Sequence, residues 1–152
     1  MADALLEQLA GEWIGKGTGI QRPGAPSESL YCRIASEIVE DGAALEQTGR
    51  CALGNDTGAL QVRIRALAGG LYDGTMTSPA MRGAAAIAGT GGGRRLELEA
   101  VYEDSKTGRP IRSLVSLSVI ADGQYRMVTR ASDAATGEPG QSSDVLFRRQ
   151  EP

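Results

Sequence analysis

Two segments of the chain alternate apolar and polar residues in strict order. Residues 60–66 read LQVRIRA and residues 96–102 read LELEAVY. Successive side chains of a β-strand point to opposite faces, so this pattern predicts strands with one face buried and the other in water. A hairpin is also predicted for residues 109–131 around Asp122-Gly123, but apolar residues fall on both of its faces. The inward face of that hairpin stays unassigned from the sequence.

Turn signals divide the remaining chain into further strand-sized segments. They are clusters of Gly, Pro, Asn, Asp and Ser at residues 23–26, 41–42, 54–56, 69–70, 78–79, 91–93, 104–108, 122–123 and 137–140. Regular spacing of this kind is typical of an antiparallel meander and predicts about nine or ten strands. Only residues 2–10 have a helical pattern, with Leu5, Leu6 and Leu9 on one stripe and Gly11 as the stop. Such a short helix needs tertiary contacts, so we expect it to cap another structure.

An open sheet of ten strands would leave two unpaired edges, and closure into a barrel removes both. We therefore predict an all-β protein: one up-and-down antiparallel barrel of about ten strands, with the short N-terminal helix over one end. The chain has 152 residues, enough for one domain with a real core, and residues 1–152 are assigned to it. A sandwich of two sheets is the alternative.

The two cysteines are predicted to face each other across a hairpin. Suppose that residues 28–39 and 44–53 form a hairpin around Asp41-Gly42, in which the residue numbers of each facing pair add up to 83. Cys32 then lies opposite Cys51 on the apolar face. A two-residue loop would place their Cα atoms about 5.5 Å apart and a four-residue loop about 4.5 Å, both within reach of a disulfide. In a reducing cytosol two buried thiols are favoured over the disulfide. Either way we expect a structural role.

Composition excludes several classes of site. The chain has no histidine and only two cysteines, so Ser-His and Cys-His nucleophiles, His-ligated haem and ordinary zinc sites are ruled out. We expect no cofactor and no metal. The net charge is −3, the pI is near 5.0 and no basic run occurs, so we expect no nucleic-acid partner.

The sequence as written also bears on location. It lacks an apolar stretch of the roughly 20 residues that a membrane helix needs, and its start lacks the pattern of a signal peptide. We therefore expect a cytoplasmic protein without a membrane span. A Cys32–Cys51 disulfide would point instead to the periplasm and to a trimmed mature chain.

The segment 9–19, LAGEWIGKGTG, carries a resemblance. A short helix, a Gly-x-Trp at the start of the first strand and glycines at alternate positions resemble the opening of lipocalin-like, calycin-type barrels. The likeness is greatest to nitrobindin-like and uncharacterised bacterial lipocalin-like families. The resemblance implies a barrel of about ten strands, with Trp13 in a structural role across the closed end under the helix. The haem binding of nitrobindin-like proteins does not carry over, because this chain has no histidine ligand.

A barrel of this size can either fill its interior or keep a cavity for one small ligand. Small residues are predicted to point inward and favour a cavity: Ala84, Ala86, Ala88 or their neighbours, Gly74, Gly83, Ser116 and Ser118. We predict non-enzymatic binding of a small hydrophobic or amphipathic molecule inside the barrel. Aromatic and soft side chains are expected to line the pocket, with an arginine for an anionic group. These candidates are Tyr31, Tyr72, Met76, Tyr102, Tyr125, Met127 and Arg130.

Two other functions stay open. One is a small calycin-like enzyme, an isomerase or cyclase that uses Tyr or carboxylate groups as acid and base; a carboxyl with a strongly shifted pKa inside a pocket would favour it. The other is a packed scaffold without a ligand, which acts through its surface or as a homodimer. The sequence favours the binding protein over the enzyme.

Overall fold

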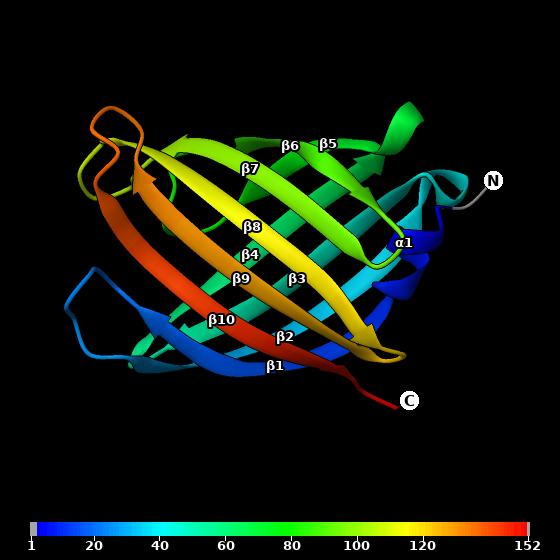
Figure 1. The fold of residues 1–152 in the computed structure, drawn as a ribbon. Helices are drawn as coiled ribbons and strands as arrows, with labels where there is room; N and C mark the ends of the chain where they lie inside the picture. The colour runs from blue at the N-terminus through cyan, green and yellow to red at the C-terminus, as the bar shows by residue number, and fades with distance from the viewer. Residues whose placement is uncertain (1–2, 152) are drawn as a thin grey trace.

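A computed structural model describes residues 3–151, which form a closed barrel of ten antiparallel strands (Figure 1). Each strand pairs with its neighbours in the chain, and β10 pairs back to β1. This confirms the predicted up-and-down barrel. The strands are β1 (Gly11–Ile20), β2 (Glu28–Val39), β3 (Ala44–Leu53), β4 (Asp56–Ala66), β5 (Leu71–Thr77), β6 (Ala85–Gly92), β7 (Arg95–Glu103), β8 (Pro110–Ala121), β9 (Gln124–Asp133) and β10 (Pro139–Arg149). Two short 3₁₀ turns lie at Glu40–Gly42 and Ala68–Gly70.

Helix α1 (Ala4–Gln8) lies at one end of the barrel (Figure 1). The carboxylate of Asp3 accepts a hydrogen bond from the backbone N–H of Leu6, which satisfies a donor that the first helical turn leaves unpaired. Leu5, Leu6 and Leu9 are buried against the barrel core. The predicted capping helix is therefore present, and its apolar stripe closes this end, which we call the helix end.

The register assigns one face of every strand to the interior. Trp13 and Phe147 lie on the inner face of β1 and β10, and the pairing extends this face around the barrel. On β8 and β9 the odd-numbered residues point inward, which settles the face that the sequence left open. On β6 the inner residues are Ala85 and Ile87, the neighbours of the predicted alanines. On β8 the expectation of inward Ser116 and Ser118 was wrong, because the register turns Val115 and Leu117 to the interior.

Four inward glycines stand where adjacent strands approach too closely for any side chain. A Cβ atom at Gly17, Gly49, Gly74 or Gly89 would lie 1.8–2.3 Å from a carbonyl oxygen of the neighbouring strand. Glycine kinks of this kind allow a sheet to coil tightly enough to close. The high glycine content of the chain therefore reflects bends in the strands as well as turns between them.

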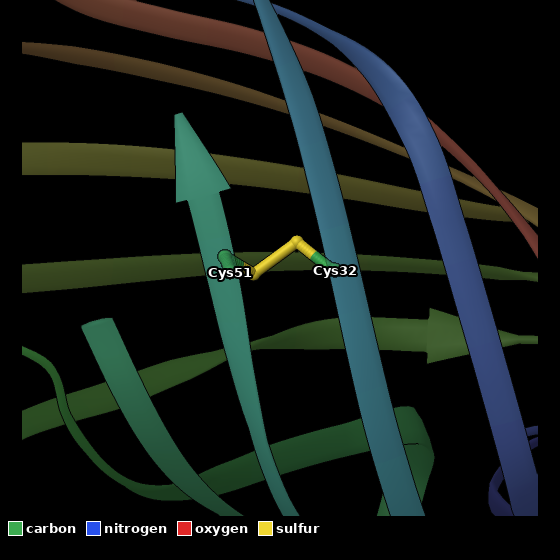
Figure 2. Close-up of a disulfide and its surroundings, with 2 residues drawn as sticks. All are labelled: Cys32 and Cys51. Carbon is green, nitrogen blue, oxygen red and sulfur yellow. A yellow bond between two sulfur atoms is a disulfide. The ribbon is translucent and has the colours of Figure 1, made fainter. Parts of the chain in front are cut away.

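The cysteine hairpin has the predicted register. Residues of β2 and β3 pair with numbers that sum to 83, so Cys32 lies opposite Cys51. Residues 40–43 form a four-residue connection, and the Cα atoms of the two cysteines are 4.1 Å apart, as expected for a close, non-hydrogen-bonded pair. A disulfide joins them (Figure 2). The favoured interpretation as two thiols was wrong, because this close pairing brings the two sulfur atoms within bonding distance on the same inner face.

The first prediction concerns the inward glycines. Gly89→Ala should lower the free energy of unfolding by about 2 to 4 kcal/mol, because the new methyl group collides with the backbone carbonyl of Glu97. Gly92→Ala on the same strand is the control, since its Cβ meets nothing within 4 Å. Urea denaturation measures both. Equal stability of the two variants would contradict this account of the strand bends.

The second prediction concerns the Cys32–Cys51 disulfide. Its two cysteines are 19 residues apart in the chain, so reduction should lower the free energy of unfolding by about 3 kcal/mol through the greater entropy of the unfolded chain. Denaturation with and without dithiothreitol measures this difference. The Cys32→Ala/Cys51→Ala variant should show no further loss on reduction, which separates loss of the bond from other effects of the reagent.

Candidate functional site

The barrel interior is packed with aromatic rings at the helix end. The ring centroids of Trp13 and Tyr125 are 4.7 Å apart in an edge-on arrangement, and Tyr125 stacks on Phe147 at 4.6 Å. All three side chains are almost fully buried. Gly15 makes room for this stack, because a Cβ atom there would lie 2.5 Å from the ring of Phe147. The indole N–H of Trp13 donates to the carbonyl of Leu9 at the end of α1 over 2.9 Å.

Arg149 completes the closure of this end. Its guanidinium lies 4.7 Å from the Trp13 ring centroid and donates to the backbone carbonyls of Gln8 and Ala10. The last carbonyls of a helix are left without helical partners, and a cation there also interacts favourably with the helix dipole. One arginine therefore connects the last strand, the aromatic core and the end of α1.

Tyr72 fixes the other side of the same helix. Its hydroxyl donates to the carboxylate of Asp3, with O–O distances of 3.2 and 3.1 Å. Burial and then this hydrogen bond raise the pKa of Tyr72 to about 12. Burial likewise raises the pKa of Tyr125 far above its ordinary value. Both tyrosines remain protonated at neutral pH and serve the packing of the helix end.

The inner face of the opposite half is less completely shielded from solvent than the helix end. Side chains on the inner face there remain partly exposed, although they lie on strands of a closed wall. Water can reach inward-facing atoms of such a wall only through the barrel interior. We call this half of the barrel interior the open half. Its partly exposed inner-face residues include Leu30, Leu60, Val62, Met76, Tyr102, Val115, Met127, Thr129 and Ser143.

The segment between β5 and β6 forms part of the rim of this half. Met81 is buried and makes an isolated β-bridge with Asp104, and Pro79 packs where a side chain on Gly58 would otherwise lie. The backbone N–H of Arg82 donates to the carbonyl of Glu103 over 2.9 Å. This segment therefore bridges β4 and β7 where β5 and β6 are too short to reach.

Two other loops at this rim share one turn, D-x-x-T-G-x-P, at residues 104–110 and 133–139. In each, the Asp carboxylate accepts hydrogen bonds from the backbone N–H groups two and three residues later. Arg109 of the first loop pairs with Asp133 of the second, and this contact chiefly lowers the pKa of Asp133 to about 2. The repeat is visible in the sequence, but each copy by itself indicates only a turn.

The structure separates the predicted ligand-binding residues into three groups. Met76, Tyr102 and Met127 point into the open half. Tyr72 and Tyr125 also face inward but are packed at the helix end. Tyr31 and Arg130 lie on the outer face of β2 and β9, so an inward role for them was wrong. Sequence reasoning missed Leu60, Val62, Val115, Thr129 and Ser143, although the alternation of residues 60–66 already marked the first two.

Tyr31 instead lies beside a shallow hollow of about 400 Å³ on the outer wall. Ile14, Lys16, Leu146, Arg148 and Gln150 complete its lining, and all belong to the outer face of β1 and β10 or the residue after it. A second shallow hollow, of about 220 Å³, lies between β1, β2 and β3 next to Glu12 and Glu46. Neither hollow includes the residues of the open half.

Charged groups in the described chain do not gather into a metal centre. Within residues 3–151 no three His, Cys, Asp or Glu side chains come together in a way that could hold a metal ion. Several carboxyls have a lowered pKa, through an arginine partner at Asp73 and Asp144 and through backbone N–H groups at Asp104. No helix in this part of the chain is long and apolar enough to cross a membrane.

Comparison with known proteins finds relatives in structure alone. No family model and no curated protein sequence matches the chain. The structure of an S-type phycobiliprotein lyase, CPES, from Guillardia theta is similar, with a TM-score of 0.60 and 9% identity over 97% of this chain and 91% of that one. The structure of EF1p2_mFAP2b bound to DFHBI is similar as well, with a TM-score of 0.56 and 10% identity over 96% and 97% of the two chains.

The likeness is one of fold. Identities of 9% and 10% carry no residue-level correspondence, whereas the high coverage shows that the whole barrel is shared. The ten-stranded barrel agrees with the calycin-type architecture that the N-terminal motif implied. Membership of a nitrobindin-like family stays a prediction.

The contact of Tyr72 with Asp3 makes the third prediction. A pKa raised from 10.0 to about 12 means that the folded state holds the phenol proton more tightly than the unfolded chain does. The resulting stability is fully present below pH 10 and is lost as the pH rises towards 12. Tyr72→Phe should lower the free energy of unfolding at pH 7 by about 1 to 2 kcal/mol and flatten this alkaline decline.

Urea denaturation at pH values from 7 to about 12 measures both effects. Tyr31→Phe is the matched control, because Tyr31 is exposed on the outer face. If Tyr72→Phe kept the full alkaline decline, the assignment of that decline to Tyr72 would be wrong.

Proposed function

We propose that this protein binds one small, largely apolar molecule in the open half of the barrel. The observation that carries the proposal is the partial exposure of inward-facing apolar side chains in the middle of a closed wall, such as Val62, Val115 and Met127. Apolar surface facing a narrow space gains free energy when a ligand replaces the water there. The packed helix end supplies a rigid floor for such a site, and the ligand enters from the opposite end.

The structural neighbours support this proposal at the level of the fold. One of them is bound to DFHBI, so a barrel of this fold can hold a small molecule, and the other is named a phycobiliprotein lyase. Met76, Tyr102 and Met127 are the earlier candidates that lie in the proposed site. Tyr102 is half buried, and burial raises the pKa of its hydroxyl, so it stays a neutral hydrogen-bond donor.

The fourth prediction tests where the ligand binds. The fluorescent probe N-phenyl-1-naphthylamine is uncharged, and its emission rises in apolar surroundings, so titration should show saturable binding. Val115→Trp fills the open half and should weaken this binding by about tenfold or more, a loss of about 1.4 kcal/mol. Leu114→Trp, at the neighbouring outward position that is 52% exposed, should leave the dissociation constant unchanged.

Far-ultraviolet circular dichroism should show that both variants keep the β-structure. Absence of saturable probe binding to the unaltered protein would contradict the proposed function. Equal binding by the two tryptophan variants would place the probe outside the barrel and would contradict the proposed site.

A further inference from the structure

The charged residues on the inner face are confined to the ends of the strands. Glu28, Asp56 and Asp133 lie at the rim of the open half, and Arg149 lies at the helix end over Trp13. Between these positions, every inner-face residue of the ten described strands is apolar, glycine or an uncharged polar residue. An ion bound inside would therefore lose its water without gaining a partner of opposite charge, which is costly.

One side of the open half carries hydroxyl groups. Thr129 on β9 lies opposite Ser143 on β10, and Ser113 on β8 faces inward one step nearer the rim, paired with Ala131. Ser113 is only 7% exposed. Within residues 3–151, none of these three hydroxyls makes a side-chain hydrogen bond. Every side-chain oxygen there that is fully shielded from solvent has a hydrogen-bond partner. The Ser113 hydroxyl is therefore not fully shielded from solvent.

The other side of the open half is apolar. Leu60, Val62 and Met76 point inward from β4 and β5, which lie across the barrel from β9 and β10 in the strand order. The interior therefore has an apolar wall opposite a wall with free hydroxyl groups. This arrangement fits a molecule with an apolar body and one polar group that can share a hydrogen bond.

We propose that the open half selects an uncharged ligand, whose apolar body packs on β4 and β5 and whose neutral hydroxyl or carbonyl group bonds Thr129 and Ser143. This inference rests on the proposed function and adds the ligand class. It also replaces the arginine-bound anion that the sequence suggested, because Arg130 lies on the outer face and no basic residue lies on the inner face of the described strands between their ends.

Three molecules with the same eight-carbon chain test the ligand class at pH 7: 1-octanol, octanoate and octylamine. Each is titrated against the complex with N-phenyl-1-naphthylamine. 1-Octanol should displace the probe at a concentration about tenfold or more lower than either ion requires. Only the ions lose the hydration of a charged group when they bind. Displacement by octanoate or octylamine at the same or a lower concentration would overturn the inference and leave the proposed function standing. Absence of any probe binding would overturn both.

The hydroxyl wall is tested by the double variant Thr129→Val/Ser143→Ala, which removes both hydroxyls and nearly keeps the side-chain shapes. Loss of this hydrogen bonding should raise the concentration of 1-octanol needed for displacement by about three- to tenfold. Thr75→Val, on the exposed outer face of β5, is the control and should behave like the unaltered protein. Unchanged displacement by 1-octanol in the double variant would show that these hydroxyls do not contact the ligand.

Discussion

Closure of β1 on β10 is the contact on which the rest of the molecule depends. It is possible because β1 presents glycine at the inner positions where β10 crosses it. The ring of Phe147 occupies the space above Gly15, and the carbonyl oxygen of Asp144 lies where a side chain on Gly17 would be. A side chain at either position would hold the strands apart and leave two unpaired edges. The interior exists only because these two edges meet.

Large and small residues are distributed unevenly along the barrel axis, and this unevenness creates the candidate site. Trp13, Tyr125 and Phe147 gather at the helix end, where α1 and Arg149 cover them. The inner face of the other half carries aliphatic side chains, hydroxyls and glycines, and several of these residues are only partly buried. The aromatic stack and the leucines of α1 bury apolar surface at the helix end, which stabilises the fold there. The proposed function would thereby place stability at the helix end and binding in the open half.

The outer wall carries cross-strand ion pairs. Arg65 pairs with Asp73, Arg112 with Glu99 and Arg126 with Asp144, each between neighbouring strands. Exposed pairs of this kind contribute little to stability, about 0 to 1 kcal/mol each. They do penalise a slipped register, because a shift by one residue would turn their charges toward the core. The disulfide between β2 and β3 fixes the same register on the inner side of the sheet.

The sequence by itself determined the strands, the meander order, the capping helix and the pairing of Cys32 with Cys51. These features depend on local alternation, turn residues and hairpin geometry, all of which are visible over about 25 residues. The sequence also marked Met76, Tyr102 and Met127 as candidates for the interior. It failed at Tyr31 and Arg130, and it left the faces of β8 and β9 open. On β8, Leu114 and Ile120 are about half exposed on the outer wall, so apolar residues occupy both faces and alternation no longer identifies the inner one.

Only the tertiary structure decided those faces, because side-chain direction on each strand follows from its register with two neighbours around a closed ring. The hydroxyl wall has the same origin: Ser113, Thr129 and Ser143 are far apart in sequence and ordinary in isolation, and only the pairing of β8, β9 and β10 turns them to one side of the same space. The residues of a strand specify where it can form. Closure of the barrel specifies what each of its side chains faces.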